Sequence, residues 1–247
     1  MNRKAVCLIL TLALTLTCAA CSKKEPDVAV SGSVSESSVP DTNPSGSVTA
    51  PAEDKSAEEE TEIRIGSVTG GNYRNEYFGV ACDFSSDWTF YTDEELATLY
   101  STVVDLTNDE EVSALLEEGG YAYDMFAYAD SGLVTVNAVI EKLSLIYGVT
   151  LSEEEYAQLS MDNAVDGLNS IDGYAVQSSE LTTITFAGAE HSAIRLLTTY
   201  TEDGYDYDLY QLLVCVKNSN YVMGVTFTSY IEDITDTLAE GFYAIEG

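Results

Sequence analysis

Basic residues and histidine are scarce in this chain of 247 residues. Ten Lys and Arg stand against 42 Asp and Glu, which gives a formal net charge of -32 at pH 7. Nucleic acids and anionic lipid head groups would be repelled by so acidic a chain. The single histidine is His191, so any histidine-based catalytic scheme would have to use it. No Gly-x-Ser-x-Gly motif accompanies it, and we expect it at a hairpin end without a catalytic role.

Spacings typical of metal-binding and redox motifs are missing from the domain. Downstream of residue 21, no Cys-x-x-Cys or His-x-x-x-His pair occurs, which excludes a tetrahedral zinc site there. Cys82 and Cys215 fall on predicted strands with apolar neighbours. A disulfide between them is allowed outside the cytosol, but two buried thiols are the favoured alternative because a domain of this size needs no covalent crosslink.

Aromatic residues and prolines are absent from opposite parts of the chain. No aromatic residue precedes Tyr73, and no proline follows Pro51. The residues of 21–65 are rich in Ser, Pro and Glu, so they cannot bury enough apolar area to offset the entropy of ordering them. We therefore predict a disordered tether over 21–65 and a single domain over 66–247. That domain carries four basic and 32 acidic residues.

The apolar run over 5–17 falls short of the roughly 20 residues that span a bilayer. It follows two basic residues and ends at Cys18-Ala19-Ala20-Cys21, which is the layout of a secretory signal peptide over 1–20. The small residues before Cys21 resemble a bacterial lipobox. The resemblance implies lipidation of Cys21 and an anchor at the outer surface of the cell membrane. The alternative is ordinary secretion with an unmodified Cys21.

Helix and strand patterns predict an α+β domain. Helices should begin at four capping boxes, where Ser or Thr is followed three residues later by Glu, at Thr92, Thr107, Ser152 and Ser229. Alternating apolar segments separated by turn residues predict strands at 75–84, 121–129, 133–143, 176–186, 193–200, 207–216 and 221–228. This order predicts a layered domain with a mainly antiparallel central sheet between helices. Leu209–Val216 is apolar on both faces apart from Gln211, as a central strand requires.

Two motifs lie near the start and the end of the domain. The first is Asn75-Glu76-Tyr77-Phe78-Gly79-Val80, followed by Phe84 and Trp88-Thr89-Phe90, and the second is Ile184-Thr185-Phe186-Ala187-Gly188-Ala189-Glu190. Together they resemble the PsbP-like family. The resemblance implies an antiparallel sheet between helical layers. The family has no common catalytic site and includes photosystem accessory proteins and bacterial lipoproteins of unknown role, so it implies no enzymatic activity.

Oxygen ligands for calcium are grouped around one predicted turn. Asp203, Asp206 and Asp208 lie beside Gly204, and hard oxygen ligands are what this ion prefers. The alternative is that Asp206 and Asp208 alternate with tyrosines along a strand and form its solvated face. Tyrosines near hairpins are candidates for a sugar or cationic-peptide surface, although tyrosine also suits half-buried strands. These residues are Tyr121, Tyr123, Tyr128, Tyr200, Tyr205, Tyr207 and Tyr210.

The leading hypothesis is an extracytoplasmic, membrane-anchored lipoprotein with a non-catalytic binding or scaffolding domain. Its expected partners are the membrane, through the lipid anchor, and an envelope protein or polymer, with no nucleic acid and no cofactor. A calcium-binding surface domain is one alternative. A hydrolase acting on envelope polymers is another, although the many carboxylates identify no catalytic pair by themselves.

Overall fold

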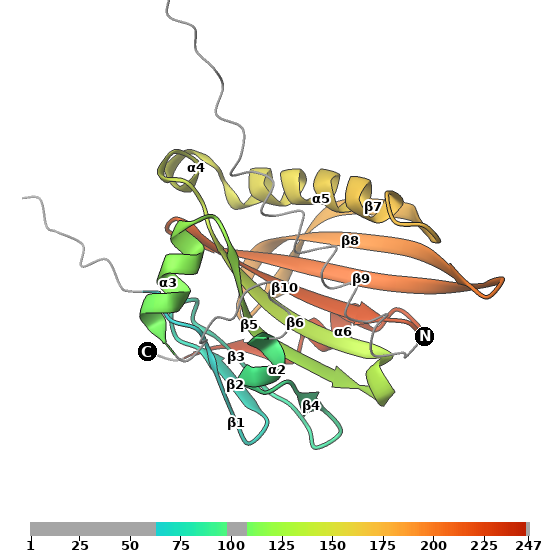
Figure 1. Cartoon of the computed structure of the whole chain (residues 1–247), viewed down its shortest axis with the longest axis horizontal. Coiled ribbons are helices and arrows are strands. Elements are labelled where there is room, and N and C mark those ends of the chain that lie inside the picture. The colour runs from blue at the N-terminus through green and yellow to red at the C-terminus, as the bar shows by residue number, and fades with distance from the viewer. Residues whose placement is uncertain (1–62, 98–107, 246–247) are drawn as a thin grey trace, which may run out of the picture. The chain divides into compact units, whose positions relative to one another are not determined.

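The computed structural model describes residues 63–97 and 108–245 (Figure 1). The predicted signal peptide, Cys21 and the tether up to residue 62 lie outside the described residues. The folded domain already includes Ile63, which is buried in the core. It therefore begins three residues before the predicted boundary at Gly66.

A seven-stranded antiparallel sheet forms the centre of the domain (Figure 1). Its order across the sheet is β4-β5-β6-β10-β9-β8-β7, so the hairpin of β5 and β6 lies beside the meander of β7 to β10. The strands are β4 (Thr89–Phe90), β5 (Tyr121–Ala129), β6 (Val134–Lys142), β7 (Tyr174–Phe186), β8 (Ala189–Glu202), β9 (Tyr205–Asn218) and β10 (Tyr221–Ser229). β5 and β6 flank a short 3-10 turn at Asp130–Gly132, where a three-residue hairpin loop was predicted.

Two tight turns explain why the meander strands are longer than predicted. Ala187-Gly188 and Asp203-Gly204 each have positive φ at both positions, from 46° to 81°. Two-residue turns of this kind match the right-handed twist of the flanking strands. Pairing therefore continues to the ends of the hairpins, with Phe186 opposite Ala189 and Glu202 opposite Tyr205.

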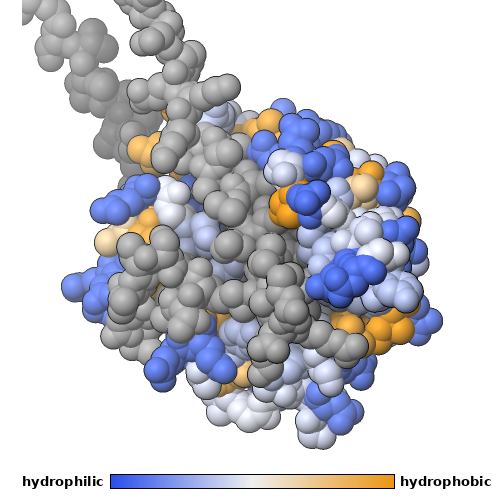
Figure 2. Space-filling view, turned by 45° about the vertical axis from the view of Figure 1, so that its right-hand side comes forward, coloured by the Kyte–Doolittle hydropathy of each residue, from blue (hydrophilic) through white to orange (hydrophobic). Residues whose placement is uncertain are grey.

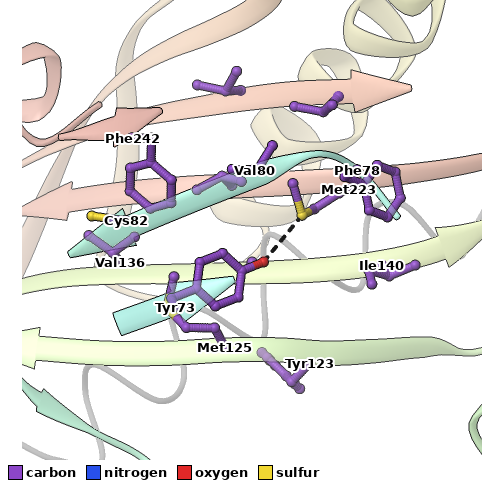
Figure 3. Packing of buried hydrophobic residues seen from close by; sticks show 14 of the residues in the cluster. Tyr73, Phe78, Val80, Cys82, Tyr123, Met125, Val136, Ile140, Met223 and Phe242 are labelled. Atoms are coloured by element: carbon purple, nitrogen blue, oxygen red, sulfur yellow. Dashed lines mark hydrogen bonds between the residues drawn. The ribbon is translucent and has the colours of Figure 1, made fainter. Parts of the chain in front are cut away.

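A second, four-stranded sheet lies against one face of the large sheet. It has the order β1-β2-β3-β11, with β1 (Ser67–Thr69), β2 (Asn72–Asn75), β3 (Val80–Asp83) and β11 (Phe242–Ala244). Figure 3 shows the core between the sheets, where Tyr73, Cys82 and Phe242 meet Val136 and Met223. The short helix α6 (Thr235–Ala239) adds Ala239 to this cluster.

Helices also pack against the large sheet, and the longest of them covers the face opposite the second sheet. α5 (Glu153–Asn169) runs along β7, β8 and β9, while α2 (Asp93–Ala97) and α3 (Asp109–Glu117) lie against β5. The buried side of α5 forms a second cluster with the sheet, in which Tyr156 and Leu168 pack with Leu209 and Cys215. The predicted α+β class with a mainly antiparallel central sheet is confirmed. The prediction did not include the second sheet, which takes the place of a helical layer on one face.

Two predicted elements are wrong in their extent. The strand predicted over 75–84 is a hairpin, because residues 76–79 form a turn in which Gly79 has φ 67°. The helix predicted from Ser229 is wrong, since Ser229 ends β10 and pairs with both Val134 and Tyr210. Ser229 is fully buried, and its strand pairing outweighs the local capping signal. Only a short helix follows, and Phe242 belongs to β11 rather than to a helix.

Two of the other capping signals, at Thr92 and Ser152, begin helices where they were predicted. Ser152 and Glu155 form a complete capping box at the start of α5. At α2, the Glu95 N–H donates to Thr92 Oγ1 at 3.2 Å and the Thr92 N–H donates to Glu95 Oε2 at 2.9 Å. α3 is capped by Asn108, whose side chain accepts from the Glu110 N–H. Thr107 lies outside the described residues.

Candidate functional site

The predicted calcium ligands lie on an exposed hairpin. Asp203 is in the turn between β8 and β9, and Asp206 and Asp208 follow on β9. Asp206 accepts a hydrogen bond from Thr201 Oγ1 at 2.7 Å and Asp208 from Thr199 Oγ1 at 3.4 Å, across the strand pair. Within residues 63–97 and 108–245, no group of three or more His, Cys, Asp and Glu side chains is arranged to hold a metal ion.

His191 pairs with a carboxylate that joins three elements. Its Nδ1 lies 3.1 Å from Glu153 Oε2, and the same carboxylate accepts the backbone N–H groups of Ser192 at 2.7 Å and Lys217 at 3.1 Å. Burial opposes the charge of Glu153, but the hydrogen bonds from His191, Ser192 and Lys217 outweigh it and lower the pKa of this carboxyl. Glu153 thus fastens the first turn of α5 to β8 and β9.

The two cysteines of the domain are buried thiols on opposite faces of the large sheet. Cys82 belongs to the cluster between the two sheets and Cys215 to the cluster beneath α5. They are therefore not bonded to each other. Burial, followed by the charge of Asp83, raises the pKa of Cys82 to about 12.

The tyrosines singled out in the sequence do not form one surface. Tyr123 is buried in the core, and Tyr200 is buried in a stack with Tyr174 at a ring-centroid distance of 4.6 Å. Tyr205 and Tyr207 are exposed on the β8–β9 hairpin. Most of these rings therefore serve packing, as tyrosine on half-buried strands does.

Two buried carboxyl groups have displaced pKa values but lie inside the sheets. Burial raises the pKa of Asp124, although Tyr73, the Gly66 N–H and Asn75 all donate hydrogen bonds to it. Burial also raises the pKa of Glu141 to about 7. Asp124 sits at a bulge in β5 and links that strand to the second sheet. These positions indicate structural roles.

A pocket of about 510 Å³ opens beside α6. It is lined by Ile184, Thr185, Ala187, Gly188, Asp236, Ala239, Glu240 and Phe242. Asp236 is held in an ion pair with Arg195 at 2.5 Å. The lining contains no histidine, cysteine, serine or lysine, and its titratable groups are the carboxyls of Asp236 and Glu240.

Among residues 63–97 and 108–245, the most exposed hydrophobic residues gather on a short helix that was not predicted. This helix, α4 (Leu145–Thr150), lies between β6 and α5 at one end of the domain (Figure 1). Leu145, Ile146 and Val149 are 78%, 74% and 87% exposed, and Tyr147 is 40% exposed. On the face shown in Figure 2, hydrophobic side chains occur only as small separate groups among hydrophilic ones. Exposed apolar side chains that gather in one place indicate a candidate contact surface.

α4 is fixed firmly to the turn between β9 and β10. Gly148 is buried, and a Cβ atom there would lie 2.6 Å from the Cβ of Asn220, so only glycine allows this approach. The Leu143 N–H donates to the Asn220 carbonyl at 2.7 Å. Lys217 Nζ donates to the carbonyls of Gly148 and Ser219, both at 2.8 Å. The exposed apolar residues therefore sit on a rigid base.

Sequence reasoning missed α4 because its signals are short and mixed. Ser144 caps it by accepting the Tyr147 N–H at 3.4 Å, but position 147 is Tyr instead of the Glu of a capping box. The apolar residues directly follow the predicted strand 133–143 and read as its continuation. The useful signal was the absence of acidic residues from 142 to 152 in so acidic a chain.

Comparisons with known proteins give resemblance in structure only. No family model and no curated protein matches the chain. The cyanobacterial PsbP protein, CyanoP, of Synechocystis sp. PCC 6803 is 11% identical with a TM-score of 0.44, over 72% of this chain and 98% of that protein. LpqN, involved in cell envelope biogenesis of Mycobacterium tuberculosis, is 15% identical with a TM-score of 0.37, over 66% and 82% of the two chains. Similarity at this level assigns neither a family nor a function.

Among the described residues, no helix is long and apolar enough to cross a membrane.

Proposed function

We propose that this chain is an extracytoplasmic lipoprotein, anchored through Cys21, whose α+β domain binds or scaffolds another component of the cell envelope and has no catalytic role. The N-terminal charged, apolar and small-residue pattern supports export and lipidation. The observation that carries the binding role is the rigid presentation of exposed apolar residues on α4.

The distribution of titratable groups supports binding over chemistry. Active sites bring groups with displaced pKa values together in a cleft. Here Tyr73, Asp124 and Glu141 have raised pKa values, but all three are buried in the sheets. The pocket beside α6 contains none of them. The interior positions of these two carboxyl groups and of Tyr73 therefore support a binding role for the domain.

Intact mass of the protein extracted from membranes tests the anchor. We expect a chain that begins at Cys21 and carries diacylglycerol, found in the membrane fraction. The matched control is Cys21→Ser, which should lose the lipid and appear in the soluble fraction. A wild-type chain found mainly in the medium, with an unmodified Cys21, would refute the anchor.

A further inference from the structure

The apolar residues of α4 form a tip that projects from the domain. Leu145, Ile146 and Val149 are 74–87% exposed. Side chains in a flat apolar patch shield one another, so values this high mean that each of the three stands almost free. A rigid protein partner would need a deep, matched pocket to surround them. The fluid hydrocarbon of a bilayer can surround such a tip without a preformed pocket.

Three polar groups of the tip are paired within the protein. The Gly148 N–H donates to the Ser144 carbonyl at 2.7 Å, and the Leu151 N–H donates to the Tyr147 carbonyl at 2.9 Å. The Thr150 hydroxyl donates to the Ile146 carbonyl at 2.8 Å. Unpaired backbone groups are strongly unfavourable in hydrocarbon. These internal hydrogen bonds lower the cost of bringing the tip to the edge of the hydrocarbon.

The tip is free of carboxylates in a domain that is otherwise rich in them. No Asp or Glu occurs in 142–152 or in 209–231, and these segments meet where α4 contacts the β9–β10 turn. Two of the four basic residues from Gly66 onward, Lys142 and Lys217, belong to these segments. The first exposed carboxylate after α4 is Glu154. The acidic remainder repels anionic head groups, so this end is the one that can approach a bilayer.

Tyrosine and lysine side chains lie at the base of the tip. Tyr147 is partly exposed, and the rings of Tyr77 and Tyr221 meet edge to face with centroids 5.6 Å apart. Lys142 Nζ pairs with Glu117 Oε1 of α3 and lies 5.3 Å from the centroid of the Tyr221 ring. Side chains with an apolar body and a polar or charged end favour the head-group level of a membrane.

The geometry points to α4 as a membrane-contact tip, in which Leu145, Ile146 and Val149 enter the outer edge of the bilayer hydrocarbon while Tyr147 and the lysines stay among the head groups. This inference names the partner for the binding surface of the proposed function and rests on that function for the anchor. Three aliphatic side chains give only a reversible contact, which an anchor on the same chain strengthens by raising the local concentration. The 41 residues between Cys21 and Ile63 can span at most roughly 140 Å, so the anchoring membrane is within reach.

A fluorophore at Val149 tests the contact in the full-length protein. Val149→Cys is labelled with an environment-sensitive dye, and the lipidated chain is reconstituted in vesicles of phosphatidylcholine with one quarter phosphatidylglycerol. Ile231→Cys is the matched control because Ile231 is an exposed apolar residue outside the tip, at 55% exposure. Nitroxides on the lipid acyl chains should quench the dye at position 149 at least about twofold more than at 231. Adding Leu145→Ser and Ile146→Ser should remove this difference.

A second arm separates failure of the tip from failure of the anchor. The Cys21→Ser chain has no lipid, so its flotation with the same vesicles reports the tip alone and should fall about tenfold on Leu145→Ser and Ile146→Ser. If the intact mass shows no diacylglycerol, the anchor is refuted, but the flotation result for the Cys21→Ser chain is unaffected. Equal quenching at 149 and 231 in vesicle-bound protein overturns the tip. The tip is also overturned if the dye emission at position 149 shifts to the blue with an envelope protein and without lipid. A blue shift that grows with protein concentration in the absence of vesicles overturns it as well.

Discussion

Glu141 is a carboxyl group held in the interior, on the helix-covered face of β6. Its Oε1 has no hydrogen-bond partner among the described residues. Burial raises its pKa from 4.5 to about 7, against the lowering effect of a hydrogen bond from Tyr156. Because the folded state holds the proton more tightly than the unfolded state, the free energy of unfolding falls as the pH rises from about 4.5 to about 7.

We therefore predict that Glu141→Gln is more stable than the wild type at pH 8, by roughly 1–3 kcal/mol, and nearly equal to it at pH 4.5. Urea unfolding at a series of pH values measures this difference. The exposed Glu154→Gln is the control and should track the wild type at every pH. A Glu141→Gln curve parallel to the wild type would show that residue 141 is not protonated on folding.

Cys82 and Cys215 are buried thiols, one in each hydrophobic cluster. Alkylation requires an exposed thiolate, and burial raises the pKa of Cys82 to about 12. We predict that iodoacetamide at pH 8 modifies neither residue in the folded protein and both after unfolding in guanidinium, with rates that differ by at least roughly 100-fold. Peptide mass measures each site. Resistance after unfolding without reductant would reveal a disulfide instead.

At the scale of elements, α4 is positioned by one glycine. We predict that Gly148→Ala destabilises the domain by about 1–3 kcal/mol, because the new Cβ would lie 2.6 Å from the Asn220 Cβ and 3.0 Å from its Cα. Denaturant unfolding followed by circular dichroism measures the loss. Val149→Ala, one residue on and 87% exposed, should change stability by less than about 0.5 kcal/mol. Equal stabilities for the two variants would show that Gly148 is not tightly packed against Asn220.

The strand β11 contributes one large side chain to the core between the sheets. The centroid of the Phe242 ring lies 5.1 Å from the ring centroid of Phe186 and 5.4 Å from that of Phe227. Phe242→Ala should cost about 3–5 kcal/mol of unfolding free energy. The neighbouring Tyr243→Ala, whose side chain is only partly buried, should cost much less. Thermal unfolding of both variants tests whether β11 is part of the core, and similar midpoints would show that it is not.

Sequence patterns predicted elements well where local chemistry alone decides the structure. The capping box at Ser152 and the turn residues of the meander do not depend on distant partners, and α5 and β7 to β10 follow them. Ser229 failed as a helix signal because its strand partner, Val134, is far away in the sequence. The exposed tip on α4 was missed for a related reason: burial of Gly148 against Asn220 becomes visible only when the β9–β10 turn is in place.

At the scale of the whole molecule, repulsion among carboxylates opposes compaction. The 32 acidic residues from Gly66 onward face only four basic ones. Salt screens such repulsion, with a Debye length of about 30 Å at 0.01 M and about 8 Å at 0.15 M. We predict that raising NaCl from about 0.01 M to about 0.2 M increases the Tm by a few degrees. Differential scanning calorimetry measures the shift. A Tm independent of salt would show that the charges are too well separated to matter.

The second sheet links distant parts of the chain, since Cys82 of β3 pairs with Phe242 of β11, 160 residues later. Such a sheet cannot close until the last strand has been made and brought back. The β7 to β10 hairpins can pair locally, but the core of Figure 3 depends on Phe242. In the export that we propose, a chain emerging in order from a translocation channel stays without its finished core until nearly all of it has crossed. Late closure of this kind would leave the part still inside a narrow channel free to remain extended.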